Sequence, residues 1–321
     1  MNVPTIADVR AAAAAIAPHI RRTPILESDA LNARLGARVL VKAECLQRFG
    51  SFKLRGATNK IASLTLEERS RGVAAFSSGN HAIAVAAAAR AYGVPAVIVM
   101  PADAPQIKTD QVRALGGEIV PYDRVTQDRE AILGAIAQAR GLPIVRPFDD
   151  PHIIAGQGTC GLEIAEDVEV APDLVLVNAS GGGLATGVAL AIHDRWPHAQ
   201  VFAVEPEGHD DIAQSLRRGE IIANAPGVRS ICDALMAERM GRMPFALAQD
   251  HLAGALAVTD DAVRAAMRAA FETVKIVVEP GGAAALAAAL SGAIEVRGKT
   301  IVVIASGGNV DAATFAAALA G

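Results

Sequence analysis

The sequence contains little cysteine, and its cysteines are scattered. Cys45, Cys160 and Cys232 are odd in number, lie far apart and form no Cys-x-x-Cys pair. A disulfide-built domain has many closely spaced cysteines, and a structural zinc site needs paired ligands. The three cysteines therefore argue against a disulfide framework and a zinc knuckle, and they favour a reducing compartment.

The chain also lacks an excess of positive charge, a long apolar run and a secretion signal. Its 30 Lys and Arg residues stand against 34 Asp and Glu residues, a formal net charge of -4, and the basic residues are spread out. This balance argues against nucleic acid as a partner. No run of about 18 apolar residues appears, so no membrane span is expected. The opening MNVPTIADVR has no basic segment followed by an apolar one, so we expect a cytoplasmic protein.

Short β-rich runs alternate with alanine-rich helical stretches along the 321 residues. One such run, at 96–100 (AVIVM), precedes a helical stretch at 105–116. The run at 301–305 (IVVIA) has no polar alternate position, which is typical of a strand buried on both faces. The alternation predicts βαβ units, and hence an α/β fold of open, mostly parallel sheets with helices on both faces.

The length predicts two closely packed domains. No linker rich in Pro, Gly or Ser divides the chain, so the boundary is placed where the sheet is expected to break. We predict a small domain at 50–148 and a large domain made of 1–49 together with 149–321. Ligands are expected in the cleft between the two domains, outside the carboxyl ends of the strands.

Three loops rich in Gly, Ser and Asn each follow a predicted strand and lead toward a predicted helix. They are 77–81 (SSGNH), 180–184 (SGGGL) and 306–309 (SGGN). Backbone N–H groups at such positions bind anions. Glycine also permits a tight turn from strand to helix, and for one loop alone that explanation is as good. Three such loops in one chain favour a bound anion.

Two segments of the sequence partly match nucleotide-binding motifs, but neither has the required spacing of glycines. In 181–187 (GGGLATG) the last glycine comes one residue too late for Gly-x-Gly-x-x-Gly, and no ribose-binding acid is evident downstream. The sequence Gly298-Lys299-Thr300 superficially matches a Walker motif, but Gly292 is one residue too far and the segment leads into a strand. We therefore expect neither a Rossmann oxidoreductase nor a nucleotide-binding P-loop.

The segment 51–57 (SFKLRGA) places two cations, Lys53 and Arg55, at the predicted start of a helix. The positive end of the helix dipole disfavours each cation by up to about 1 kcal/mol. A solvated helix start with neighbouring acids is one explanation. The other is that the Lys53 amine is consumed as a Schiff base, beside an aromatic ring and near a phosphate.

Taken in order, the segments SFKLRGA, SSGNHA, SGGGLATG and SGGNVD resemble the fold-type II family of pyridoxal-phosphate enzymes. The resemblance is to the branch of threonine dehydratases, serine dehydratases and serine racemases, and it covers nearly the whole chain from Arg21. It implies the tryptophan synthase β-like fold, with two open sheets, the cofactor in the interdomain cleft, and a homodimer.

The resemblance implies a role for each loop. Lys53 resembles the lysine that forms the Schiff base, with Phe52 packed on the cofactor ring, and Asn80 resembles the asparagine that bonds the ring hydroxyl oxygen. The backbone of Gly181, Gly182, Gly183 and Leu184 resembles the phosphate cradle, and Ser306 the hydroxyl that faces the pyridine nitrogen. The substrate-binding residues it implies are Ser77, Ser78, Asn80, His81 and Arg129. The sequence departs from the family at Ile83, where glutamine is common, and at Ser180, where glycine is usual.

The resemblance also implies a reaction. A neutral hydroxyl at Ser306 cannot hold a proton on the ring nitrogen, so the cofactor is a weaker electron sink and prompt loss of a β leaving group is favoured. We expect Lys53 to take the α proton from L-threonine or L-serine, with release of a 2-oxo acid and ammonia. Serine racemase is the nearest alternative, because Ser78 resembles the racemase serine, whereas Phe148 matches the dehydratases. Nothing favours a non-catalytic protein that stores the cofactor or senses amino acids.

A divalent metal site is expected in 204–211 (VEPEGHDD). Glu205, Asp211 and the backbone carbonyl of His209 fall where related racemases and dehydratases bind Mg²⁺ or Ca²⁺, and Mn²⁺ is a further candidate. Oxygen ligands suit such hard cations, with water completing the shell. On composition alone, a solvated acidic loop is the better explanation of the cluster, and it is the resemblance that favours a metal site.

Arg129 resembles the racemase arginine that reaches the mouth of the active site and binds a dicarboxylate. Thr126 is the expected N-cap, which would put Arg129 at the third helical position, where an acid is preferred. A surface ion pair would explain the arginine equally well. If Arg129, or Arg239 in the loop after Cys232, faces the pocket, 3-hydroxyaspartate becomes the alternative substrate, giving oxaloacetate and ammonia.

Overall fold

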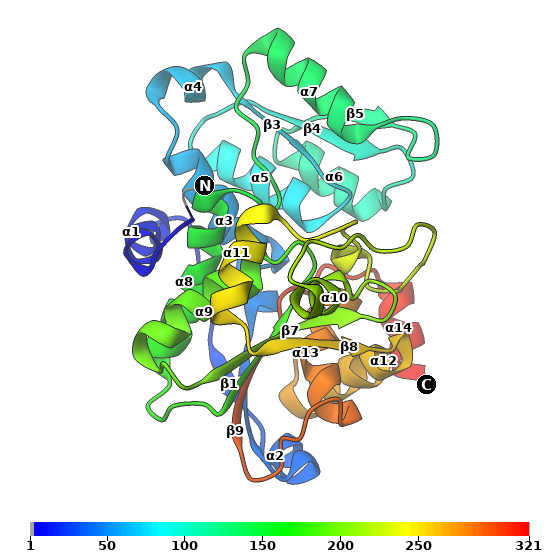
Figure 1. The fold of residues 1–321 in the computed structure, drawn as a ribbon. Helices are drawn as coiled ribbons and strands as arrows, with labels where there is room; N and C mark the ends of the chain where they lie inside the picture. Colours follow the sequence, from blue (N-terminus) through cyan, green and yellow to red (C-terminus); the bar gives the residue numbers. More distant parts are fainter. Residues whose placement is uncertain (1–2, 321) are drawn as a thin grey trace.

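A computed structural model describes residues 3–320 and contains two sheets (Figure 1). The large sheet has the strand order β1-β2-β9-β6-β7-β8 and the small sheet the order β3-β4-β5. Within the described residues, β1 pairs antiparallel with β2, and the other paired strands are parallel. The strands are β1 (Ile25–Glu27), β2 (Arg38–Lys42), β3 (Val73–Phe76), β4 (Ala96–Pro101), β5 (Glu118–Tyr122), β6 (Leu174–Asn178), β7 (Gln200–Pro206), β8 (Gly254–Val258) and β9 (Thr300–Ile304).

Helices connect most of these strands. The α-helices are α1 (Ile6–Ile16), α2 (Asp29–Leu35), α3 (Lys53–Ala62), α4 (Leu66–Arg71), α5 (Asn80–Ala91), α6 (Gln106–Ala114), α7 (Arg129–Arg140), α8 (Pro151–Asp167), α9 (Gly183–Arg195), α10 (Asp211–Arg218), α11 (Arg242–His251), α12 (Asp260–Ala269), α13 (Pro280–Ser291) and α14 (Ala312–Ala320). Four shorter helical segments are η1 (Glu44–Leu46), η2 (Arg48–Gly50), η3 (Asp233–Leu235) and η4 (Ala270–Val274). No helix among the described residues is long and apolar enough to cross a membrane.

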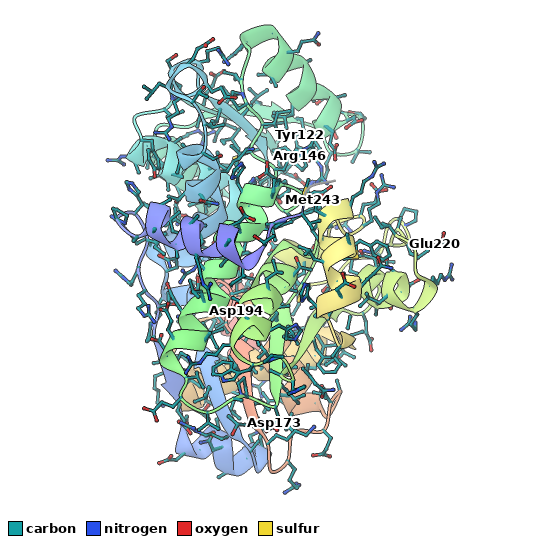
Figure 2. The ribbon with its side chains drawn as sticks, turned by 60° about the vertical axis from the view of Figure 1, so that its left-hand side comes forward. Tyr122, Arg146, Asp173, Asp194, Glu220 and Met243 are labelled. Atoms are coloured by element: carbon teal, nitrogen blue, oxygen red, sulfur yellow. The ribbon has the colours of Figure 1, made fainter. Side chains whose placement is uncertain are left out.

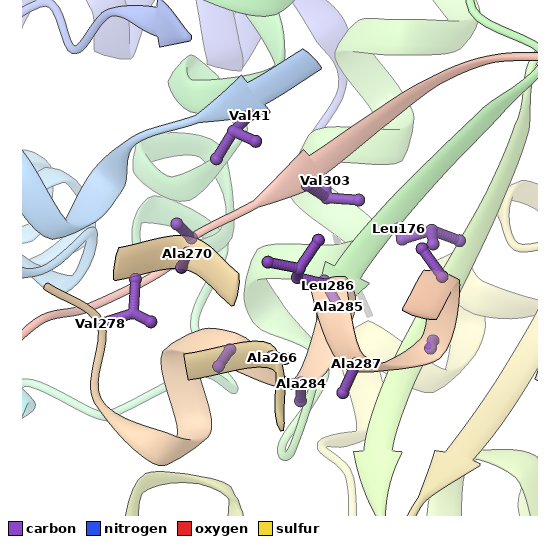
Figure 3. Close-up of a cluster of buried hydrophobic side chains, with 14 of the residues drawn as sticks. Val41, Leu176, Ala266, Ala270, Val278, Ala284, Ala285, Leu286, Ala287 and Val303 are labelled. Carbon is purple, nitrogen blue, oxygen red and sulfur yellow. The ribbon is translucent and has the colours of Figure 1, made fainter. Parts of the chain in front are cut away.

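Both faces of the large sheet are covered by helices, and the middle positions of its central strands are apolar. Val41, Leu176 and Val303 point to one face, where α12 and α13 bury them (Figure 3). The residues next to them on the same strands, such as Val302 and Val177, point to the other face and pack on α8 and α9. Successive side chains of a strand alternate between faces, so a strand covered on both sides needs apolar residues throughout.

The small sheet is built in the same way. Ala75 and Ile98 pack with α5 on one face, and Ala74 and Val99 pack with α7 on the other. We call this sheet with α4 to α7 the small lobe, and the remainder the large lobe. The predicted α/β fold with two mostly parallel sheets is confirmed.

The join between the lobes lies near the predicted domain boundaries. The strands of the small sheet all fall within 50–148, and those of the large sheet fall outside this range. The division at 50 and 148 itself stays a prediction. Asp149, just past the second boundary, accepts the backbone N–H of Met243 at 2.9 Å and so holds the start of α11 near the join. Figure 2 shows Met243 between Tyr122 of the small lobe and Asp173 at the far end of the large lobe.

Candidate active site

One cavity between the two lobes collects every cofactor and substrate residue predicted from the sequence. Its walls come from the starts of α3, α5 and α9, from the loop after β9, and from η3. The predicted residues that line it are Phe52, Lys53, Ser77, Ser78, Asn80, His81, Arg129, Gly181, Gly182, Gly183, Leu184 and Ser306. Their position at the carboxyl ends of parallel strands is the usual place for a ligand in this class of fold.

Lys53 is the first residue of α3 and points into the cavity. Its Nζ donates to the backbone carbonyl of Pro147 at 2.9 Å and lies 5.1 Å from the centre of the Phe52 ring. Burial lowers the pKa of Lys53 to about 8, because the charged amine loses its hydration. A depressed pKa increases the fraction of neutral amine, which is the nucleophilic form.

Arg55, the second cation of the same segment, is fully buried and does not line the cavity. Its guanidinium donates to both carboxylate oxygens of Glu44, at 2.8 and 2.9 Å, and to both of Glu163, at 2.7 and 2.8 Å. Lys42 also donates to Glu163, at 2.6 Å. The unfavourable helix position of Arg55 therefore has a structural cause: two cations balance two buried acids.

The glycine loop at the start of α9 is shaped by close packing. Gly182 has φ +88°, a backbone conformation that favours glycine. A Cβ at Gly181 would lie 2.1 Å from the ring of Phe148, so no other residue fits there without a shift. Ser180, the departure from the family pattern, accepts the N–H of Ala237 at 2.9 Å through its hydroxyl. The N-terminus of α9 thus faces the cavity, where its free N–H groups favour an anion.

The Ser77–His81 loop brings two serines and a neutral histidine to the cavity. The Ser77 hydroxyl accepts the N–H of Gly79 at 3.1 Å. His81 lies 2.9 Å from the Val145 carbonyl through Nε2, and burial, with a smaller contribution from the charge of Lys53, lowers its pKa to about 3. His81 is therefore uncharged at neutral pH and donates from Nε2. Ser78 lines the same cavity and lies partly buried at its wall.

The structure corrects the predicted start of the helix that carries Arg129. Asp128, not Thr126, is the N-cap of α7, and its carboxylate accepts the N–H groups of Glu130 and Ala131. A carboxylate caps a helix at least as well as a threonine hydroxyl. Arg129 is consequently the first helical residue. Its guanidinium lies 4.7 Å from the centre of the Phe76 ring, whereas the exposed Arg239 does not line the cavity.

Ser306 is oriented by Asn178, the last residue of β6. The Asn178 Nδ2 lies 2.9 Å from the Ser306 Oγ and 2.8 and 3.0 Å from the carbonyls of Ile304 and Gly282, so its two hydrogens are shared among three acceptors. An amide nitrogen can only donate, so the Ser306 oxygen acts as an acceptor toward Asn178. The proton of the Ser306 hydroxyl therefore remains free to point into the cavity.

Asn80 meets a buried acid at the floor of the cavity. Its Nδ2 donates to the Oε1 of Glu279, and its Oδ1 accepts from Asn309 at 2.8 Å. Burial raises the pKa of Glu279 to about 7, and its Oε2 has no partner among the described residues. Glu279 is thus a carboxyl group that holds its proton near neutral pH, directly beside the predicted cofactor residues.

Comparison with known proteins decides the family. A family model described as pyridoxal-phosphate dependent enzyme matches residues 16–307. The chain belongs to this family of pyridoxal-phosphate-dependent enzymes. It is 42% identical over 322 residues to L-threo-3-hydroxyaspartate ammonia-lyase of Saccharomyces cerevisiae, covering 100% of this chain and 98% of the yeast protein.

Two further relatives agree with this assignment. The chain is 42% identical over 311 residues to serine racemase of Oryza sativa subsp. indica, covering 95% of this chain and 91% of the rice protein. The structure of maize serine racemase matches with a TM-score of 0.94 and 39% identity, covering 99% of this chain and 98% of that one. The predicted family and its cofactor, pyridoxal phosphate, are confirmed.

The cavity of this pyridoxal-phosphate enzyme has suitable groups for both the phosphate and the pyridine nitrogen of the cofactor. The N–H groups at the start of α9 suit the phosphate. The free proton of the Ser306 hydroxyl suits an unprotonated pyridine nitrogen, because a hydroxyl that already accepts from Asn178 has its own hydrogen left to donate. A neutral donor there leaves the ring less electron-withdrawing than a carboxylate would.

Sequence reasoning missed three residues of this site. Asn178 ends an apolar strand, and its polarity in DLVLVNAS was the available signal. Glu279 precedes Pro280 and reads as an ordinary helix N-cap. Lys108 reads as part of a solvated helix, yet it is buried, lines the cavity and pairs with Asp233 at 2.7 Å. The pair joins α6 of the small lobe to η3 of the large lobe.

The predicted metal residues lie together, apart from the cavity. Glu205 is fully buried and accepts the N–H groups of Ile212 and Ala213, each at 3.1 Å. Burial raises the pKa of Glu205 well above its ordinary value and that of Asp211 to about 6. The ring of His209 bonds the Val228 carbonyl, at 3.1 Å. Within residues 3–320 no group of three or more Asp, Glu, His or Cys side chains is placed to hold a metal. The Asp211 carboxylate accepts from the Asn224 side chain and from the Met240 N–H, each at 2.7 Å, and carboxylate oxygens are the ligands that hard cations prefer.

Proposed function

We propose that this enzyme eliminates water from a β-hydroxy amino acid and releases a 2-oxo acid and ammonia, with 3-hydroxyaspartate as its preferred substrate. The elimination of hydroxy amino acids agrees with the activities for which its relatives are named, which include L-threo-3-hydroxyaspartate ammonia-lyase and L-threonine ammonia-lyase. The observation that carries the preference is the charge of the cavity. Four cationic side chains line it against two acids.

The residues of this chain have separate tasks in the reaction. Pyridoxal phosphate, when bound, withdraws electrons from the α carbon of the substrate. Lys53, whose pKa of about 8 allows a neutral amine, is placed to hold the cofactor and then to take the α proton. The N-terminus of α9 would hold the phosphate of the cofactor, and the Ser306 hydroxyl would donate to its ring nitrogen.

The preference for a substrate with a carboxylate in its side chain follows from which of the four cationic side chains already have a partner. Lys53 is committed to the cofactor, Lys108 pairs with Asp233, and Arg124 pairs with Asp103 at 2.7 Å. Among the described residues, no acid lies within ion-pair distance of Arg129, which stacks on Phe76 at the cavity wall. A guanidinium that lies over a ring and has no acidic partner keeps N–H donors free for a carboxylate.

The test compares three substrates. Arg129 is exposed at the cavity wall, so we expect Arg129→Ala to lower kcat/KM for 3-hydroxyaspartate by a factor of about 5, the upper range for an exposed charge pair, with little loss for L-serine and L-threonine. Arg124→Ala is the matched control, because Arg124 also lines the cavity but has Asp103 as its partner. Equal losses for all three substrates in Arg129→Ala would reject the assignment.

Serine racemisation is a second candidate function, because Ser78 lines the cavity with Lys53. Racemisation needs an acid or base on each face of the substrate, and a serine hydroxyl is the kind of group that supplies the second. We expect Ser78→Ala to abolish formation of D-serine while sparing elimination from L-serine. Chiral chromatography of residual serine, with an ammonia assay on the same sample, measures both. Formation of D-serine at the wild-type rate would remove Ser78 from this role.

We also propose a divalent cation at Glu205, Asp211 and the carbonyl of His209. A cation would offset the loss of hydration on burial, which raises the pKa of both carboxyl groups. The expected result is that EDTA lowers the thermal midpoint of the wild type, that Mg²⁺ or Ca²⁺ restores it, and that Asp211→Asn no longer responds. Asp210→Asn is the matched control, because this neighbouring acid is not among the expected ligands. A wild-type midpoint that ignores EDTA and both cations would dismiss the site.

A homodimer in a reducing cytoplasm completes the proposal. The three cysteines are all buried free thiols, which suits a reducing compartment. Light scattering coupled to size-exclusion chromatography measures the mass, and a monomer near 33 kDa would contradict the dimer.

A further inference from the structure

The side-chain amide of Asn80 is held at both ends. Its Nδ2 donates to Glu279, and its Oδ1 accepts from the Nδ2 of Asn309 at 2.8 Å. An asparagine amide turned over by half a rotation exchanges its donor and its acceptor while keeping its shape. The orientation of Asn80 therefore depends on which of its neighbours cannot be turned over.

Asn309 is such a neighbour because a backbone carbonyl fixes it. Its Nδ2 donates to the carbonyl of Phe49 at 2.9 Å as well as to Asn80. A carbonyl oxygen only accepts, so the amino end of Asn309 has to face Phe49. The same amino end reaches Asn80, which must turn its oxygen toward Asn309. The N–H donors of Asn80 are then left for Glu279 and for the cavity.

The backbone around Asn309 holds it in this place. Gly308 donates to the carbonyl of Gly50 at 2.9 Å, and Phe52 donates to the carbonyl of Ser306 at 3.1 Å. A Cβ at Gly50, which has φ +78°, would lie 2.3 Å from the Oδ1 of Asn309. The loop after β9 is thus fixed to the segment before Lys53. Asn309 itself does not line the cavity, so we expect it to act on the cofactor through Asn80.

We propose that Asn309 is a positioning residue that turns Asn80 so that an N–H group, and not a carbonyl oxygen, faces the ring oxygen of pyridoxal phosphate. The inference rests on the proposed function and on the predicted role of Asn80, which resembles the asparagine that bonds the ring hydroxyl oxygen. A donor at this point stabilises the form of the bound cofactor whose ring oxygen is an anion, relative to the form whose ring oxygen carries the proton. The two forms absorb at different wavelengths, the anionic one at the longer.

The experiment records the absorption spectrum of the loaded enzyme for N309D and N309A. In N309D the new carboxylate can only accept, so it attracts the amino end of Asn80 and turns that side chain over. The expected result is a fall in the ratio of the long-wavelength to the short-wavelength band by about tenfold, the effect of losing one hydrogen bond to a charged oxygen. N309A leaves Asn80 free to keep its bond to Glu279, so its ratio should fall by clearly less. A role in packing alone predicts the opposite order, because alanine removes more volume than aspartate.

An Asn80→Ala background separates this effect from the charge of the new carboxylate. If N309D acts through Asn80, adding it to Asn80→Ala leaves the ratio unchanged. Loss of cofactor binding in N309D but not in N309A, with the fold retained by circular dichroism, supports the proposal in the same way. The inference is overturned if N309A lowers the ratio as much as N309D, or if N309D still lowers it in the Asn80→Ala background. A wild type whose spectrum shows no cofactor bound through Lys53 would instead overturn the proposed function, and the inference with it.

Discussion

Replacing Arg55 by methionine tests whether the second cation of the SFKLRGA segment is structural. Arg55 is fully buried and donates five hydrogen bonds, two to Glu44, two to Glu163 and one to Thr159. With Arg55 removed, the two acids keep Lys42 as their cation. One negative charge is then left in the interior without compensation.

The expected cost is large because the remaining charge is buried. Removing one partner of a buried ion pair costs about 3–5 kcal/mol, most of it the penalty for the charge left behind. Neutralising that charge should recover part of the loss, so the double variant Arg55→Met/Glu44→Gln should be more stable than Arg55→Met alone. Arg113→Met, which breaks an exposed pair with Asp110, should cost less than about 1 kcal/mol.

Urea unfolding at neutral pH, followed by circular dichroism on the cofactor-free protein, measures these differences. Because Arg55 does not line the cavity, the folded variant should still bind pyridoxal phosphate at low temperature. The reasoning fails if Arg55→Met unfolds within about 1 kcal/mol of the wild type, the range of an exposed pair. It also fails if the double variant is no more stable than the single one.

Two further predictions concern the walls of the cavity. Because burial raises the pKa of Glu279 from 4.5 to about 7, the folded cofactor-free protein binds a proton more tightly than the unfolded chain, and its stability falls as pH rises through this window. Glu279→Gln should remove on the order of 3 kcal/mol of this fall in the free energy of unfolding. Urea unfolding at a series of pH values measures it. If the free energy of unfolding depends on pH in the same way in variant and wild type, the prediction is wrong. Gly181→Ala should weaken binding of pyridoxal phosphate by about tenfold or more, because its Cβ would overlap the Phe148 ring at 2.1 Å. Titration of the cofactor-free variant with pyridoxal phosphate measures this affinity, and an unchanged affinity would contradict the packing argument. Adding Phe148→Leu to Gly181→Ala should restore part of the lost affinity.

The loops of the site could be predicted from the sequence because each is a local pattern. A strand that runs into glycines and then into a helix places N–H groups at the carboxyl edge of a sheet, wherever that strand lies. The Gly181 loop and the Ser306 loop line the cavity for this reason. A cation at a helix start is locally unfavourable, which drew attention to Lys53 and Arg55 alike, and the resemblance of SFKLRGA to the family singled out Lys53.

The partners of these residues could not be predicted, because they come from distant segments. Glu163, which binds Arg55, lies more than a hundred positions along the chain, and no local pattern links the two residues. The same is true of Glu279 and Asn80. The start of α7 was misplaced for a different reason: Thr126 and Asp128 are both good caps, and only the tertiary setting of the loop selects Asp128.

The place of β9 in the large sheet sets the order in which the two lobes can form during synthesis. Val145 donates to Ala74 beside the small sheet, so the small lobe has its strands and helices once the ribosome has released about half of the chain. The large sheet has to wait, because β9 lies between β2 and β6, and Arg38 finds its partner only when Thr300 emerges. Until then β2 presents an unpaired apolar edge, and such an edge is a site for aggregation or chaperone binding. A chain that is cut short before β9 should therefore keep a folded small lobe and be degraded or aggregate through its N-terminal strands.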